Sequence, residues 1–323
     1  NLPFRRYVQT DFDNAQKSFL AGLGWLRLKV KSFKRRDLNF VQAHIQANGD
    51  SVADWLFRQV GDRWVISEPT SKQLGERQKV ETEHFTFYTY PWADDVNATV
   101  IELVEQARQN AVERLGKEPP QKADVYIKPI YGLTPFDNPF YLAYYSPNRK
   151  PEGPDRIEIF APHSMNFGFY DPAIGFEQPL ETILTHEYAH MIHNRNFDNV
   201  GSLSSWMSEG LAEYVADNSR DWEIRAAVRT DNIIPIIDTV SPVYKQDLQH
   251  METLEKDRSL AYGLACSLVA YIDEKHGGLE GFWKLAQAYE ETQKLDVALK
   301  ESFDVTFEEF DQGWRQWLEE TYG

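Results

Sequence analysis

The residues best suited to chemistry lie at positions 185–190, where the chain runs T-H-E-Y-A-H. His186 and His190 are four residues apart, so on a helix they share one face and lie one turn from each other. Both imidazoles could then reach one metal ion, and Glu187 could reach a water on that ion. A proline at 179 followed by an acid predicts a helix start just upstream. We therefore expect a helix that presents two metal ligands and a base.

A catalytic zinc site needs at least one more protein ligand. The best candidate follows His190 after eighteen intervening residues (191–208), where Glu209 opens the stretch E-G-L-A-E-Y. Apolar residues recur there at helical spacing, and Glu209 and Glu213 share a face at i, i+4. Two antiparallel helices joined by a loop would aim two histidines and a carboxylate at one point. An aspartate as third ligand (Asp198 or Asp217) has no supporting motif.

The H-E-x-x-H stretch, the eighteen-residue spacer and E-G-L-A-E-Y together resemble the gluzincins, which are zinc metallopeptidases of the peptidase MA-like superfamily. In that family the third ligand is a glutamate on a following helix. The resemblance implies one zinc ion per chain, held by His186, His190 and Glu209. It implies Glu187 as general base toward a zinc-activated water that attacks a peptide carbonyl. It also implies that Glu213 orients the first histidine from outside the ligand shell.

Motifs that the chain lacks narrow this class further. The metzincin pattern would need glycine at 193 and histidine at 196, but the chain has His193 and Asn196. The G-x-M-E-N motif with which the aminopeptidase branch grips a free N-terminus is absent, and the nearest text is S-M-N at 164–166. We therefore favour an endopeptidase over an aminopeptidase. The alternative from another class is a non-catalytic, surface-binding protein that keeps zinc for structure.

The oxyanion of peptide hydrolysis needs a hydrogen-bond donor besides zinc. Related enzymes use a downstream tyrosine or histidine, for which Tyr262 is the candidate and His250 and Tyr244 are the alternatives. Tyr262 lies in the apolar helical run A-Y-G-L-A-C-S-L-V-A-Y-I, so packing of a tyrosine explains it nearly as well. This run and the helical pattern after it are similar to bacterial members of the peptidase MA-like group.

Composition and charge limit the remaining possibilities. The chain has 323 residues, of which 42% are hydrophobic and 14% aromatic, as in a well-cored globular protein. The single cysteine, Cys266, excludes an intrachain disulfide framework and predicts a buried thiol. No apolar run approaches the ~20 residues that span a bilayer. The chain begins with Asn1, so we expect that an upstream signal peptide or anchor has been removed and that the protein is extracellular or at the cell surface.

The net charge of −16 is unevenly distributed. Residues 1–80 carry 14 Lys and Arg against 8 Asp and Glu, which leaves +6 there and −22 for the remainder. This difference predicts two domains, at 1–80 and 81–323. The negative charge of the second domain argues against a nucleic acid as partner and is compatible with a peptide or protein substrate.

The predicted fold class is α+β, beginning with a small helix-plus-antiparallel-sheet module. We expect a helix at 11–23, strands at 26–33, 39–46, 55–58 and 64–66, and a polar linker at 69–83. The ending G-D-R-W-V-I-S-E-P is weakly similar to nuclear-transport-factor-like or cystatin-like domains. The basic run at 29–36 is either a docking surface or a solvated strand face, and we favour the latter.

The gluzincin resemblance implies a thermolysin-like catalytic domain over 81–323, with a mixed sheet, zinc-site helices and a helical C-terminal part. The pattern predicts strands at 84–90, 123–127 and 156–161, a helix over 94–115 and a loop at 131–155. The strand at 156–161 stands just before the zinc helix. The resemblance therefore implies that it is the edge strand that pairs with extended substrate.

Overall fold

The computed structural model describes residues 27–47, 49–119, 121–130, 142–148, 153–164, 167–196, 203–234, 236 and 251–323, without the side chains of 251–258. By its packing the chain divides into two compact units. The first comprises residues 1–106, 121–148 and 152–183, and the second comprises 107–120, 149–151 and 184–323. The fold is of the predicted α+β class, with an antiparallel sheet, a mixed sheet and a helical C-terminal part. In the part of the chain described, no helix is long and apolar enough to cross a membrane.

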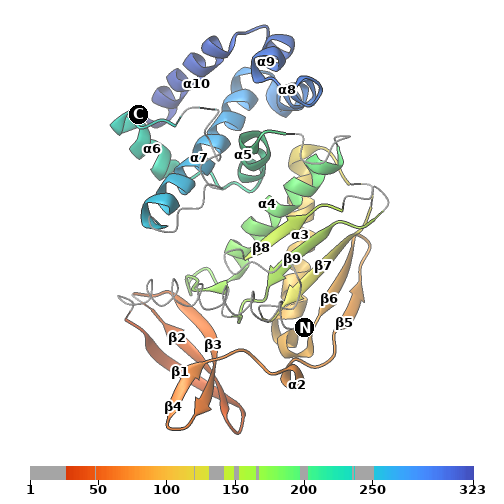
Figure 1. Cartoon of the computed structure of the whole chain (residues 1–323), viewed down its shortest axis with the longest axis vertical. Coiled ribbons are helices and arrows are strands. Elements are labelled where there is room, and N and C mark those ends of the chain that lie inside the picture. The colour runs from red at the N-terminus through yellow and green to blue at the C-terminus, as the bar shows by residue number, and fades with distance from the viewer. Residues whose placement is uncertain are drawn as a thin grey trace, which may run out of the picture. The chain divides into compact units, whose positions relative to one another are not determined.

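An antiparallel meander of four strands opens the described chain (Figure 1). Its strands, in the order β1-β2-β3-β4, are β1 (Lys29–Asp37), β2 (Phe40–Gln46), β3 (Val52–Val60) and β4 (Arg63–Ile66). Ala43 pairs with Trp55 and Ile45 with Ala53, and all four side chains are buried on one face. The Trp55 ring lies 4.8 Å from that of Phe169, centroid to centroid. The predicted strands are confirmed in this region, whereas the helix predicted at 11–23 lies outside the described residues.

Strand β1, which contains the basic run, is exposed along nearly its whole length. Arg36 is the inward-turned residue of this strand: its Nε donates to Gln42 Oε1 at 2.7 Å, and its guanidinium lies over the Trp92 ring at 5.2 Å. The strand is thus a largely solvated face with one arginine that ties it to the rest of the first unit.

The second sheet has five strands in the order β5-β6-β7-β9-β8. They are β5 (Gln78–Glu81), β6 (Phe85–Thr89), β7 (Ala123–Lys128), β8 (Ala143–Ser146) and β9 (Arg156–Phe160). Strands β6, β7 and β9 run parallel, and β5 and β8 pair antiparallel at the two edges. The mixed sheet is as predicted.

The expectation that 156–161 forms the edge strand is wrong. Strand β9 lies between β7 and β8 and is buried along most of its length, as an interior parallel strand must be. The edge strand is the four-residue β8, which falls in the predicted loop at 131–155. The opposite edge, β5, is fully exposed and falls in the predicted linker at 69–83. Because each is only four residues long, neither carries enough alternation to be recognised from sequence.

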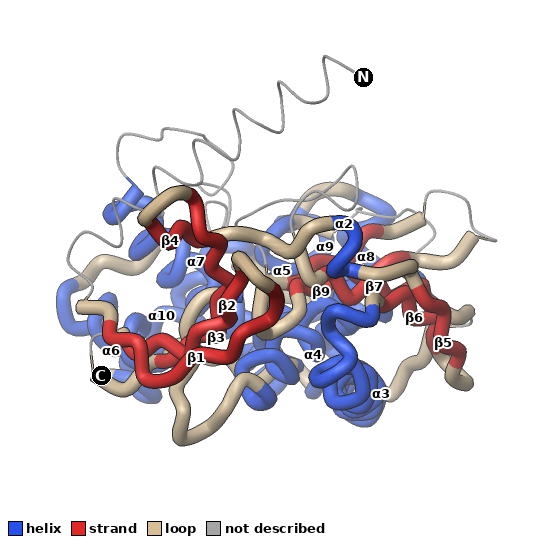
Figure 2. Tube along the Cα trace, turned by 90° about the horizontal axis from the view of Figure 1, so that it is seen from below, coloured by secondary structure: helices blue, strands red, loops and turns tan. Residues whose placement is uncertain are grey.

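Helix α3 (Asp94–Leu115) follows β6 and the short 3-10 turn η1 (Pro91–Ala93). Two aspartates in its first turn face the positive end of the helix dipole, and Gly116, with φ of +64°, ends it. Its buried stripe recurs at helical spacing and consists of Val100, Val104, Ala107, Ala111 and Leu115. The first half of α3 lies along one face of the five-stranded sheet (Figure 2).

The second unit is helical and is built around α7 (Met251–Lys275). Helix α7 packs against α5 (Ser205–Val215), α6 (Asp221–Thr230), α8 (Gly278–Thr292) and α10 (Phe307–Tyr322), as Figure 1 shows. Helix α9 (Leu295–Phe303) packs against α8 and α10. Trp314 on α10 donates from Nε1 to Ser267 Oγ on α7 at 3.1 Å, and both side chains are buried. The helical C-terminal part predicted from the sequence is therefore present, and α7 contacts α8 and α10 within it.

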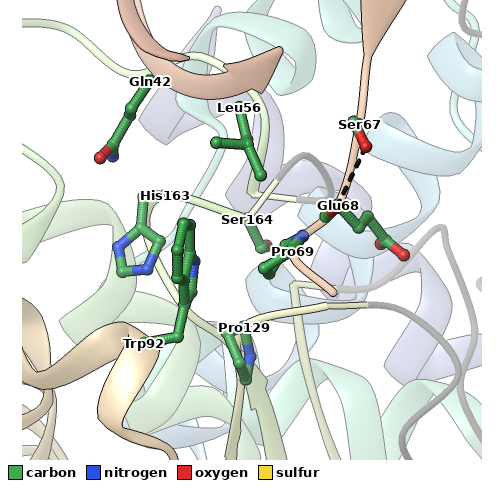
Figure 3. A pocket seen from close by; sticks show the side chains of 9 residues that line it. All are labelled: Gln42, Leu56, Ser67, Glu68, Pro69, Trp92, Pro129, His163 and Ser164. Atoms are coloured by element: carbon green, nitrogen blue, oxygen red, sulfur yellow. Dashed lines mark hydrogen bonds between the residues drawn. The ribbon is translucent and has the colours of Figure 1, made fainter. Parts of the chain in front are cut away.

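A small cavity lies within the first unit, among strands β2 and β3, the segment after β4, and the segments that follow β6, β7 and β9 (Figure 3). Its volume of ≈ 10 Å³ is that of about one water molecule. The ring of His163 lies beside that of Trp92 in the cavity wall (Figure 3). Both ring nitrogens of His163 and the Ser164 hydroxyl are buried, and none has a hydrogen-bond partner among the described residues. The cavity is lined by Gln42, Leu56, Glu68, Trp92, His163 and Ser164, among others.

The burial of His163 predicts a pH-dependent stability. Burial lowers the pKa of His163 below its ordinary value of 6.5, Arg36 lowers it further, and Asp95 and Asp54 oppose the shift. Glu68 is a further carboxylate in the cavity wall. Since the unfolded chain binds a proton at this histidine at higher pH than the folded chain does, stability should fall as pH drops below about 6.5.

We expect His163→Gln to flatten this fall, by at most about 1.4 kcal/mol per pH unit. Urea unfolding of both proteins at pH 7, 6 and 5 would measure it. Equal slopes for the two proteins would assign the pH dependence to other groups.

Candidate metal centre

Three side-chain atoms converge at one point in the second unit. They are His186 Nε2 and His190 Nε2 from α4 (Glu177–Arg195) and Glu209 Oε2 from α5. The two nitrogens are 3.0 Å apart, and each is 3.3 Å from the carboxylate oxygen. The three predicted ligands are thus brought together, and within the described part of the chain no other group of this kind is found.

These distances fit a tetrahedral metal ion. Zinc binds nitrogen and oxygen at about 2.0–2.2 Å, and the edges of such a tetrahedron are about 3.3–3.6 Å long. The observed separations of 3.0–3.3 Å are close to those edges. Two imidazoles and one carboxylate are also a donor set that zinc prefers, and three protein ligands leave one tetrahedral position open. The residues present therefore fit a zinc ion.

Helix α4 positions the two histidines because its opposite side is anchored in apolar packing. Leu180, Leu184, Ala189 and Ile192 are each at most 1% exposed. The helix begins at Glu177, next to the start predicted at Gln178 and Pro179. With that side fixed, i, i+4 spacing turns both imidazoles toward the Glu209 carboxylate.

Helix α5 is held by a close approach of its backbone to α7. A Cβ added at Gly210 would lie 2.3 Å from the carbonyl oxygen of Ala265, so this position requires glycine. Trp206, Met207 and Leu211 bury the neighbouring surface of the helix. The glycine of the E-G-L-A-E-Y motif is therefore a packing residue that fixes the ligand beside it, Glu209.

Behind the first candidate ligand lies a partly buried network of ion pairs and hydrogen bonds. Glu213 Oε1 is 3.5 Å from His186 Nδ1, which is the placement predicted for Glu213, and it accepts from Arg220 Nη2 at 3.1 Å. Arg220 Nη1 donates to Ser259 Oγ at 2.9 Å, and Ser259 donates to Glu223 Oε1 at 2.7 Å. Nothing in the sequence indicated a role for Arg220, Ser259 or Glu223. Arg220 adopts the left-handed region, with φ of +52°, at the entry to α6, and no local motif announces this.

Behind the second candidate ligand lie a hydroxyl and a second imidazole. His190 Nδ1 is 3.0 Å from His193 Nε2 and 3.2 Å from Ser208 Oγ, and the latter two atoms are 2.9 Å apart. Sequence reasoning used His193 only to exclude another zinc family and passed over Ser208. A signal was available, because positions 186, 190 and 193 follow the i, i+4, i+7 spacing of one helix face.

The charged groups of the cluster shift one another's pKa values. Burial alone would raise the pKa of Glu209, but the charge of His190 and hydrogen bonds from both histidines hold it below its ordinary value. Burial would lower the pKa of His186, but its hydrogen bond to Glu209 and the charges of Glu213 and Glu187 raise it to about 9. Burial and then the neighbouring His190 lower the pKa of His193. The carboxylate ligand thus stays ionised at neutral pH.

The remaining predicted site residues are placed as follows. Glu187, half-buried on α4, is close enough to contribute to the raised pKa of His186. Tyr262, half-buried on α7, lies with its ring 5.4 Å from the Arg220 guanidinium carbon. The alternative donors, Tyr244 and His250, lie outside the described residues, and so does Asp198.

No protein-family model matches the chain, and no curated protein matches it in sequence. The likeness to gluzincins therefore depends on the motif spacing and on the geometry of this cluster.

We expect the purified protein to bind one equivalent of zinc. Glu209→Ala should retain less than about a tenth of an equivalent, because two histidines alone make a weak site. Glu280→Ala, which removes an exposed glutamate on α8, is the matched control and should keep its metal. Elemental analysis after gel filtration in chelator-free buffer would measure both. Equal zinc in the two variants would contradict the assignment of Glu209.

Proposed function

We propose that this protein is a zinc-dependent peptidase of the gluzincin type that cleaves peptide bonds within a chain. The convergence of His186, His190 and Glu209 at 3.0–3.3 Å carries the proposal. Such chemistry needs two further carboxylates, a base and a group that orients a ligand. Glu187 follows His186 in the sequence, and Glu213 lies next to the Nδ1 atom of His186.

The chemistry divides between the metal and the residues around it. A zinc ion at this site would lower the pKa of a bound water from about 15.7 towards about 7 and polarise the scissile carbonyl. In this proposal the Glu187 carboxylate takes a proton from the water that attacks the peptide carbonyl. It then passes this proton to the departing amine. Glu213, held by Arg220, keeps the proton of His186 on Nδ1 and so leaves Nε2 free to bind.

Two sequence features support an endopeptidase over the alternatives. The chain lacks the G-x-M-E-N motif, with which the aminopeptidase branch binds the free N-terminus of a substrate. The base Glu187 and all three ligands are present, whereas an inactivated, surface-binding relative would often have lost one of them.

We expect Glu187→Gln to keep its zinc and to lose peptide hydrolysis by about a hundredfold or more, because Glu187 acts as base and not as ligand. Cleavage of a mixed peptide library by the zinc-loaded protein, followed by mass spectrometry, measures both the activity and its internal or terminal position. Glu181→Gln on the same helix is the matched control. If the zinc-loaded wild type cleaves nothing, the non-catalytic alternative stands.

Tyr262→Phe tests the proposed oxyanion donor. Phenylalanine keeps the ring that faces Arg220, so the support of Glu213 should persist while the hydroxyl is lost. We expect kcat to fall roughly a hundred- to a thousandfold, with KM and zinc content nearly unchanged. Steady-state kinetics on one cleaved peptide would measure this. A normal kcat would make Tyr262 a packing residue, and Tyr244→Phe and His250→Ala would then be the next variants.

A further inference from the structure

The two ligand histidines are supported in different ways. His186 Nδ1 faces the Glu213 carboxylate, which is negatively charged and held by an arginine. His190 Nδ1 faces a hydroxyl and a second imidazole, Ser208 Oγ at 3.2 Å and His193 Nε2 at 3.0 Å. His193 is only 3% exposed, so these contacts are not shared with bulk water.

The positions of the protons follow from these distances. A histidine that binds a metal through Nε2 carries its proton on Nδ1, so His190 Nδ1–H is a donor. His193 Nε2 must then accept, because a proton on it would point at the His190 proton across 3.0 Å. The Ser208 hydroxyl can accept from His190 and donate to His193 Nε2 at 2.9 Å. This arrangement satisfies all three groups with no charge.

We propose that Ser208 and His193 are positioning residues that together hold His190 in its metal-binding tautomer through a neutral hydrogen-bonded relay. This inference rests on the metal site of the proposed function and deepens it. Each partner comes from an element that already supplies a ligand: Ser208 precedes Glu209 on α5, and His193 lies one turn beyond His190 on α4. The relay therefore also joins the two ligand-bearing helices beside the metal site.

A relay without charge is compatible with the negative charge that three glutamates already place around the site. Glu187, Glu209 and Glu213 surround the site, and Arg220 is the cation that the described contacts place among them. A further carboxylate behind His190 would add a fourth negative charge, at a position that His193 shows to be buried, and such a charge is costly without a partner. A hydroxyl and an imidazole orient the ring without that cost.

The test measures zinc affinity by competition with a chelating dye, independently of peptidase activity. Because either partner alone leaves one acceptor for His190 Nδ1–H, Ser208→Ala and His193→Phe should each weaken zinc binding only a few-fold. The double variant leaves no acceptor and should weaken it by about 10- to 100-fold, more than the product of the single effects. Ser208→Thr and His193→Gln, which restore an acceptor, should bind nearly as the wild type does. Ser205→Ala, at an exposed position on the same helix, is the control.

Two further readouts separate the relay from general damage and from failure of the site itself. Melting temperatures of the metal-free variants show whether a change in affinity merely follows a loss of folding. Nitrogen-15 NMR of the histidines in the zinc-loaded protein should show His193 protonated on Nδ1. A double variant with wild-type affinity, or a proton on His193 Nε2, would overturn the relay while leaving the metal site standing. A wild type that binds no zinc would overturn the metal site itself.

Discussion

The contact between α5 and α7 at Gly210 is the constraint on which the candidate metal centre depends. The backbones approach so closely there that a methyl group would lie 2.3 Å from a carbonyl oxygen. This contact fixes the axial position of α5, and with it Ser208, Glu209 and Glu213, which serve the site in three different ways. A shift of α5 by one residue would move all three away from the histidines of α4 at once. The geometry of the cluster is thus set by helix packing more than by the ligands themselves.

Near that contact, charged and polar side chains form a continuous series of ion pairs and hydrogen bonds. Glu213 lies between His186 and Arg220, and Arg220 passes through Ser259 to Glu223. One oxygen of Glu213, Oε2, is buried without a hydrogen-bond partner among the described residues. The left-handed backbone at Arg220 is a local cost that this network offsets.

The sequence reveals those parts of the site that depend on spacing within one helix. Two i, i+4 pairs, one on each of two helices, were sufficient to propose His186, His190, Glu209 and Glu213. The structure confirms that these four side chains lie together. His193 followed the same periodicity and was open to the same argument. Arg220 was not, since it acts across a loop and through an unusual backbone conformation.

The fold, like the site, has parts that the sequence predicts and parts that it does not. The long helices and the buried strands were predictable, because their apolar patterns extend over many residues. The two edge strands β5 and β8 were not, since each has four residues and only one neighbour in the sheet. Their existence depends on the partner strand that they meet in three dimensions, and a short polar segment gives no sign of that partner.

The buried thiol of Cys266 has a practical consequence. It follows Ala265, whose carbonyl oxygen lies against Gly210, it is only 3% exposed, and burial raises its pKa. A thiol in this state reacts only when its surroundings open, because alkylating reagents need both access and a thiolate. The rate at which the native protein is alkylated therefore reports how often the packing of α7 beside the candidate metal centre opens. A second cysteine placed on the surface would react far sooner, which leaves the rest of the molecule free for selective labelling.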